Sequence, residues 1–199
     1  MTTAPRASRH PALIARDVAG HFLRCTVGRG GIQDCRAVFD HRANDRAQRF
    51  GIGVASHSLA IGAYCDGALR PNVGVTFTQG RPLPRNNRLA MNLLAQGCTP
   101  AQTLAALEAN DPHHAHRQIA LVDREGAALA HTGSRVGTPA AHRTGSGYVA
   151  CGTTVAGEKV LDALAAAFES EATADLEDRL LIALEAGRDA GGLTGSAGA

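Results

Sequence analysis

The sequence predicts an α+β layered domain in which antiparallel strands and paired helices occupy separate stretches of the chain. Alternating apolar runs at 50–56 and 73–79 are followed by helical patterns at 89–94 and 99–110. The order then repeats, with alternating runs at 117–131 and 148–151 and helical patterns at 155–168 and 176–184. Segregated strands and helices of this kind are typical of layered α+β domains and not of doubly wound sheets.

Length and composition indicate one domain of ordinary globular character. The chain has 199 residues, of which 44% are hydrophobic and 19% charged, and it contains no Trp. The formal net charge of +2 is too small to indicate nucleic acid or an acidic membrane surface as a partner. Lys159 is the only lysine, so a mechanism that needs a lysine must use that one or the terminal amine.

The five cysteines and the N-terminus indicate a reducing compartment. The cysteines show no C-x-x-C spacing, which argues against a zinc ribbon and a full disulfide framework. Residues 1–10 lack the apolar segment of a signal peptide, and no apolar run approaches the roughly 20 residues that span a bilayer. We therefore expect a cytoplasmic protein.

The N-terminal quarter is the least regular part of the chain. Residues 1–9 are polar and contain Pro, which predicts a loose tail. Short strands are predicted at Leu13–Asp17 and Arg36–Phe39, with a Gly-rich patch between them and a polar turn after the second.

The two central strands end in polar side chains. The first alternates through Ile52 and Val54 and ends at Ser56 and His57, and the second alternates to Phe77 and ends at Thr78 and Gln79. Polar strand ends that follow an apolar pattern are the first place to look for a site, although most such ends are simply solvated.

Helix signals follow these strands. The pattern through Leu89 and Leu94 is predicted to stop at Gly97, a C′ glycine. Thr99, Pro100 and Gln102 then predict a capped helix start with a reciprocal Thr–Gln capping box.

The second half begins with a predicted hairpin. RQIALVD at 117–123 is followed by the turn REG and a second run that ends at His131. Gly-rich turns at 133–147 separate the hairpin from a strand at Tyr148–Cys151, and two amphipathic helices close the domain.

These motifs resemble the Ntn-hydrolase-like family catalogued as domain of unknown function ten-twenty-eight. The resemblance is carried by GIGVASHSLAIGA at 51–63, VGVTFTQ at 73–79, RQIALVDREG at 117–126, HTG at 131–133, HRTGSGY at 142–148 and CGTTVAG at 151–157. Their order and spacing match over roughly Gly51 to Gly192. The resemblance implies a four-layer αββα sandwich, lacking the last strand that other members have after the position of Ala199.

The resemblance also implies a chemistry. Members of the wider superfamily hydrolyse amide bonds with a Thr, Ser or Cys that begins the first strand and becomes the N-terminus after self-cleavage. The free α-amine then serves as the base, and it titrates near pH ~8, which suits this role without a lysine or a triad histidine.

Three placements of the first strand remain open. A strand that starts at Cys35 makes Cys35 the nucleophile, Asp34–Cys35 the scissile bond, residues 1–34 a tail or propeptide, and 35–199 the domain. A strand at LIARD puts His10 where the nucleophile should stand, makes 23–50 an insertion, and predicts an inactive protein. A strand that starts at Cys25 requires a still longer loop.

The other polar strand ends receive roles from the same resemblance. Ser56 and Thr78, with His57 beside them, are expected near the first strand, where a hydroxyl can orient the amine. Gln79 and Thr153 can donate hydrogen bonds to a tetrahedral oxyanion.

Two further groups of residues carry weaker signals. Arg117 can neutralise a substrate carboxylate, but we expect a surface ion pair. His113, His114 and His116 stand on an irregular stretch without a matching carboxylate or cysteine, so we expect a solvated loop and no metal. No cofactor is predicted.

We therefore expect an Ntn-type amidohydrolase that acts on a small amide or imide, a C–N bond outside peptides. The alternative is a catalytically inactive protein that binds a small molecule on the same fold, and a third reading is the non-functional product of a disrupted frame. The expected partner is a small-molecule substrate, with no nucleic acid and no membrane, and helices rich in Ala and Leu are compatible with a homodimer.

Overall fold

A computed structural model of the chain describes residues 13–16, 35–41, 50–56 and 68–194, with the first two ranges described by their backbone alone. His10, Cys25, Asp34 and His57 lie outside the described residues, as does most of the predicted 1–34 tail.

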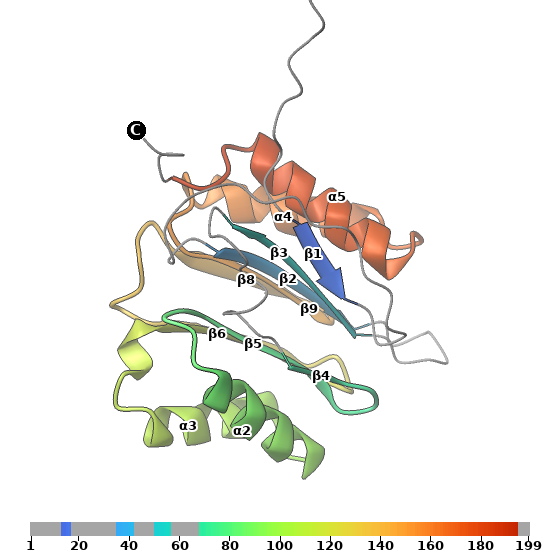
Figure 1. The fold of residues 1–199 in the computed structure, drawn as a ribbon. Helices are drawn as coiled ribbons and strands as arrows, with labels where there is room; N and C mark the ends of the chain where they lie inside the picture. The colour runs from blue at the N-terminus through green and yellow to red at the C-terminus, as the bar shows by residue number, and fades with distance from the viewer. Residues whose placement is uncertain (1–12, 17–34, 42–49, 57–67, 195–199) are drawn as a thin grey trace, which may run out of the picture.

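Two antiparallel sheets lie face to face between two pairs of helices (Figure 1). Sheet A has the order β1-β3-β2-β9-β8, and sheet B has the order β4-β5-β6-β7. The strands of sheet A are β1 (Leu13–Arg16), β2 (Cys35–His41), β3 (Phe50–Ser56), β8 (Ala141–Gly145) and β9 (Tyr148–Gly152). Those of sheet B are β4 (Ala68–Arg70), β5 (Gly74–Gly80), β6 (Arg117–Asp123) and β7 (Ala128–Thr132).

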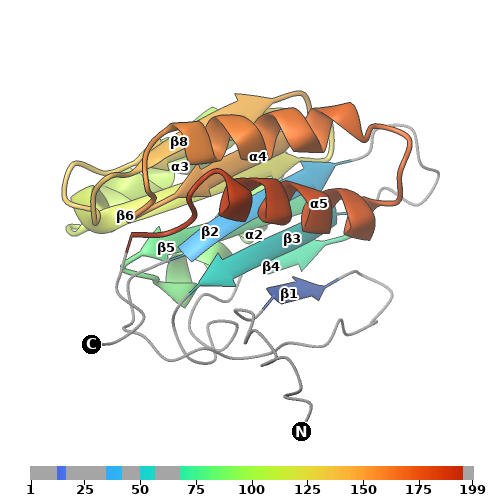
Figure 2. The same cartoon turned by 90° about the horizontal axis from the view of Figure 1, so that it is seen from above.

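Each sheet has its own helical cover. Helices α2 (Pro84–Ala95) and α3 (Pro100–Asn110) pack on sheet B, and a short 3₁₀ helix, η1 (His114–His116), leads from them into β6. Helices α4 (Lys159–Ser170) and α5 (Leu176–Asp189) pack on sheet A, where they run side by side (Figure 2). In the described part of the chain, none of the helices has the length and apolar character needed to cross a membrane.

Three apolar clusters hold the layers together. The cluster between the sheets takes alternate residues from both of them: Phe50, Ile52, Val54, Val75, Phe77, Ala120, Val122, Val149 and Cys151. A second cluster joins sheet A to α4 and α5, and a third joins sheet B to α2 and α3. Every strand that contributes to two clusters therefore has one row of side chains facing each, as the period of two requires.

Close packing of α5 on β3 depends on glycine. A Cβ atom at Gly51 would lie 2.7 Å from Cδ1 of Leu180, and one at Gly53 would lie 3.1 Å from Cδ1 of Leu184. The glycines of the GIGVAS motif therefore let the helix approach the strand, while Ile52 and Val54 fill the opposite face.

The predicted helix ends are confirmed in detail. Gly97 has φ +88°, its N–H donates to Leu94 O at 3.0 Å, and the next N–H donates to Leu93 O at 3.1 Å, which is a Schellman ending. Thr99 and Gln102 form the predicted reciprocal capping box at the start of α3. The hairpin at 117–131 is confirmed as β6 and β7.

Two strands were not predicted. Residues 141–145 form β8, a half-buried edge strand that the sequence analysis included in the Gly-rich turns, and 68–70 form β4. The strand β2 pairs with β3, with Cys35 opposite Ser56, and β1 pairs with the other side of β3.

Candidate functional site

Two glutamines face each other between the sheets where the apolar row of sheet B ends. Gln79 of β5 and Gln118 of β6 are direct partners in the register, and both are fully buried. They continue the rows of Phe77 and Ala120, two residues away on the same strands, which belong to the cluster between the sheets. The core is therefore replaced by polar side chains at this end.

The orientation of Gln118 is fixed by backbone carbonyls. Its Nε2 lies 3.0 Å from Ala141 O and 3.2 Å from Gly152 O, and 2.8 Å from the hydroxyl of Thr132. Carbonyl oxygens only accept hydrogen bonds, so the amide nitrogen must face them and Oε1 must face Gln79.

This orientation leaves one acceptor of Gln79 unused. Nε2 of Gln79 donates to Oε1 of Gln118 and lies 3.5 Å from Sγ of Cys151. Oε1 of Gln79 is buried and has no hydrogen-bond partner within the described ranges. An unpaired buried carbonyl oxygen costs about 1–3 kcal/mol, so the site holds an acceptor that an N–H donor would satisfy.

The same chain of hydrogen bonds reaches a half-buried histidine. Oγ1 of Thr132 lies 2.8 Å from Nδ1 of His142. Oγ1 also accepts from Gln118 and has a second acceptor lone pair, so the donor in the bond to Nδ1 depends on the tautomer of the ring. Burial, and then the charge of Arg143, lower the pKa of His142, so the ring is neutral at pH 7.

Cys151 lies in this site, but its side chain stays protonated. It is 1% exposed, and burial raises the pKa of its thiol to about 12. Since the thiolate is the nucleophilic form, Cys151 acts as a core residue.

The start of β2 lies at the same end of the fold. Cys35 pairs with Ser56, the last residue of β3, and Arg36 pairs with Gly152, the last residue of β9. Ser56 and Thr153 are 2% and 0% exposed, and Ser56 continues the inward row of Ile52 and Val54. The structure therefore brings the predicted residues Cys35, Ser56, Gln79 and Thr153 to one end of the two sheets, with Cys35 placed by its backbone.

Thr78 lies on the other face of sheet B. Its side chain points toward α2, and its hydroxyl donates to Oδ1 of Asn87 at 2.8 Å. The alternation of β5 thus separates Thr78 from Gln79, and the structure does not bring it to the site.

Arg117 also faces α2 and α3, and it forms an ion pair as expected, but the pair is buried and not at the surface. Its Nε lies 2.8 Å from Oδ2 of Asp111, and the two side chains are 9% and 1% exposed. The guanidinium also donates to Arg81 O at 2.5 Å, and Asn86 donates to Asp111 at 2.9 Å. The hydrogen bond from Arg117, more than any other contact, lowers the pKa of Asp111 to about 2.

The histidine stretch is also more buried than predicted. His114 in η1 is 8% exposed, and its ring lies 4.0 Å, centroid to centroid, from that of His131 with a tilt of 35°. No group of three His, Cys, Asp or Glu residues able to hold a metal occurs in the part of the chain that the structure describes.

Comparison with known proteins places the chain in a family. The model of a family described as "Family of unknown function (DUF1028)" matches residues 42–197. The chain belongs to DUF1028. No functionally curated protein matches the sequence.

A DUF1028 crystal structure has a similar fold. The protein is from Silicibacter pomeroyi, and it is 28% identical to this chain with a TM-score of 0.74. The similarity covers 81% of this chain and 70% of the other. The mixed α+β fold with antiparallel sheets is therefore shared with a solved DUF1028 member.

The sequence analysis missed three residues of the site: Gln118, Thr132 and His142. Gln118 follows the predicted strand start at Arg117, and alternation with Ala120 and Val122 would have placed it on the inner face. The other two come from HTG and HRTGSGY, which were recognised as motifs but given no role.

Proposed function

We propose that this DUF1028 member is a self-processed amidohydrolase of the Ntn type that acts on a small amide or imide. The observation that carries the proposal is the register of β2. Its first residue, Cys35, stands opposite Ser56 and beside the end of β9, where the buried polar side chains of the site gather. The arrangement of helix pair, sheet, sheet and helix pair also agrees with the αββα sandwich of Ntn hydrolases.

In this proposal the chain first cleaves itself. The Cys35 thiol attacks the carbonyl of Asp34, the peptide C–N bond breaks, and a thioester joins Asp34 to Cys35 Sγ. Water hydrolyses the thioester, which releases residues 1–34 as a carboxylate and leaves Cys35 with a free thiol and a free α-amine. That amine titrates near pH ~8 and takes the thiol proton during turnover.

Turnover uses the same groups. The thiolate attacks the substrate carbonyl, the C–N bond breaks, and the leaving nitrogen receives the proton held by the α-ammonium, which leaves the acyl group as a thioester on Sγ of Cys35. Water then hydrolyses this thioester, which releases the carboxylic acid and restores the thiol. Ser56 orients the amine, and Thr153 donates to the oxyanion, an interaction worth about 3 kcal/mol in comparable sites. Gln79 is not proposed as an oxyanion donor, because its Nε2 already donates to Gln118. Its unpaired atom is Oε1, which can only accept a hydrogen bond.

Substitution of the nucleophile tests the proposal. Cys35→Ala is expected to abolish both self-cleavage and turnover of small amides while the unfolding transition is retained. Cys25→Ala, at the other candidate position, is the matched control and should retain both. Wild-type turnover in Cys35→Ala would exclude Cys35 as the nucleophile.

A second function is supported by the extent of the family match. The match begins at residue 42 and thus does not include Cys35. A protein that binds a small molecule at the Gln79–Gln118 site without catalysis would need only the matched region. Ligand binding by the uncleaved chain, without product from any amide tested, would favour this function.

A further inference from the structure

We propose that the ligand of this site is a small amide that carries a carboxylate, with Arg81 and Arg135 binding the carboxylate and Oε1 of Gln79 accepting the amide N–H. The inference rests on the proposed function for the kind of bond and names the substrate class. It rests on two arginines and one unused buried acceptor at the same end of sheet B.

Arg81 stands two residues beyond Gln79. Its N–H donates to His116 O at 3.1 Å, which extends the β5–β6 ladder by one pair past Gly80 and Arg117. Two residues of extended chain span roughly 7 Å. The close approach of the two strands here requires glycine at position 80. Gly80 has φ +83°, and a Cβ atom there would lie 2.8 Å from His116 O.

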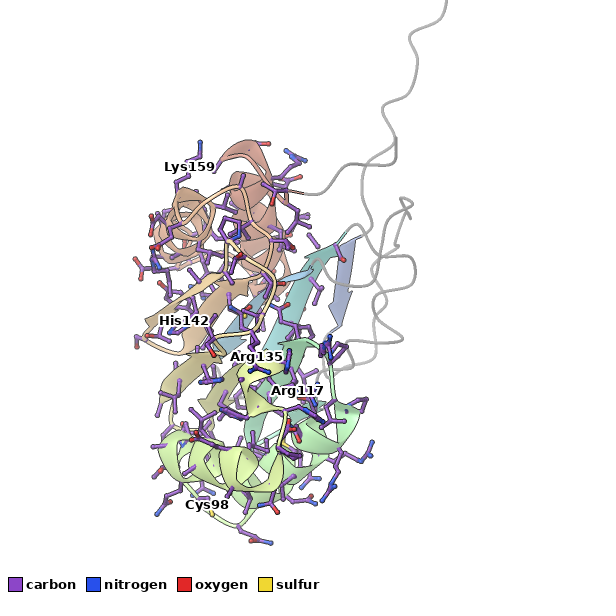
Figure 3. The ribbon with its side chains drawn as sticks, turned by 90° about the vertical axis from the view of Figure 1, so that its left-hand side faces the viewer. Cys98, Arg117, Arg135, His142 and Lys159 are labelled. Carbon is purple, nitrogen blue, oxygen red and sulfur yellow. The ribbon has the colours of Figure 1, made fainter. Side chains whose placement is uncertain are left out.

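Arg135 reaches the same place from the segment after β7. Its N–H donates to Ala115 O at 2.8 Å, so its backbone lies against η1 beside His116. In the side view, Arg135 lies between His142 of the site and Arg117 (Figure 3). Burial lowers the pKa of His116, and the charges of Arg81 and Arg135 lower it further, as expected if both guanidinium groups lie near this ring.

These two arginines have no carboxylate partner among the described residues. Four other arginines each pair with a carboxylate within 4 Å: Arg117, Arg124, Arg143 and Arg188. Arg81 and Arg135 are exposed, and neither forms an ion pair within residues 50–56 and 68–194. Two like charges held together without an acid attract an anion.

Arg117, which the sequence analysis considered as a less favoured partner of a substrate carboxylate, is not available. Its guanidinium is occupied by Asp111 and by Arg81 O. Arg117 instead holds the backbone of Arg81 in place. Binding of the ligand carboxylate is therefore assigned to Arg81 and Arg135.

The geometry defines the ligand class. Guanidinium groups bind carboxylates through paired N–H donors, and a buried amide oxygen accepts one N–H. A small ligand that satisfies both carries an amide N–H and a carboxylate in one molecule, as an N-acylated amino acid does.

Calorimetric titration of the full-length Cys35→Ala variant tests the inference without turnover. N-acetylglycine is expected to bind at least about tenfold more tightly than its neutral methyl ester. Arg81→Gln and Arg135→Gln should each weaken binding of the acid about tenfold and leave the ester unchanged. Arg88→Gln, which removes an exposed arginine of α2, is the matched control and should change neither.

Three results would overturn the inference: equal affinity for acid and ester, no binding of the acid, or arginine variants that bind as the wild type does. Competition by inorganic phosphate that is stronger than competition by acetate would also do so, by assigning the arginines to a phosphate.

The outcomes separate this inference from the proposed function. Arginine-dependent binding of N-acetylglycine without hydrolysis by the wild type would reject the hydrolase and retain the ligand class. Hydrolysis of neutral and anionic amides at equal rates would reject the ligand class and retain the hydrolase.

Discussion

The two faces of the β5–β6 ribbon use neighbouring polar residues for different purposes. On the face toward α2 and α3, Arg117 pairs with Asp111 and Thr78 pairs with Asn87, although the buried hydroxyl of Thr76 on the same face has no partner among the described residues. On the face toward sheet A, Gln79 and Gln118 form a network that ends in an unused acceptor.

A matched buried network stabilises a fold, and an unmatched one costs stability that a ligand can restore. The difference therefore separates residues that hold the helices on the sheet from residues that form a binding site. Substitutions on the face toward α2 and α3 should lower stability more than ligand affinity. Substitutions on the face toward sheet A should lower ligand affinity more than stability.

The largest effect is expected for Arg117→Met. Removing one partner leaves the buried carboxylate of Asp111 without its cation, which costs about 3–5 kcal/mol of unfolding free energy. Urea denaturation at pH 7 measures it. Arg124→Gln breaks an exposed pair and should leave the unfolding midpoint unchanged; similar losses in the two variants would contradict the structural role of Arg117.

The pH dependence of stability is the next effect. Asp111 has a pKa of about 2 in the folded protein, below its ordinary 3.8, so its ionisation favours the folded state. This contribution is complete above the ordinary pKa and is lost as pH falls from about 4 through 2.

The difference in unfolding free energy between the wild type and Asp111→Asn should therefore shrink over that range. A difference that is constant from pH 6 to 2 would show that Asp111 is not held as a carboxylate.

Thr78→Val should cost about 1–2 kcal/mol, because it removes a buried hydrogen bond to Asn87 without a change in shape. Thr76→Val is a matched control on the same face of β5. The hydroxyl of Thr76 is buried and has no partner in the described chain, so its removal should be neutral or stabilising. Equal losses in the two variants would contradict the assignment.

Gln79→Met should have the smallest effect on stability, less than about 1 kcal/mol. It removes a hydrogen bond to Gln118 together with the unsatisfied oxygen, and the two contributions oppose each other. The same variant should lose ligand affinity in the titration described above. A large loss of stability with unchanged affinity would reverse the roles assigned to the two faces.

The sequence predicts the elements whose signals are local. The capping box of α3 and the glycine after α2 depend on residues within a few positions of each other, and both are present. β8 was missed because its short half-buried run ends at Gly145 and resembles a turn, and its place at the edge of sheet A depends on pairing with β9.

The site was predicted in part because it depends on contacts between distant strands. Alternation places Gln79 and Thr78 on opposite faces of any strand, but the sequence does not show which face meets α2. Arg117 was expected at the surface because its partner, Asp111, belongs to the break after α3, a position that no helical or strand period connects to it. The partners of Gln118 come from four other strands, so only the folded chain reveals them.

The central claim is that Cys35 becomes the N-terminus of the active protein. The most direct test is the intact mass of the purified chain under denaturing conditions, followed by N-terminal sequencing. The account predicts a chain that begins at Cys35 and has lost the mass of residues 1–34. A full-length mass would contradict it and would leave the DUF1028 fold here as a binding protein.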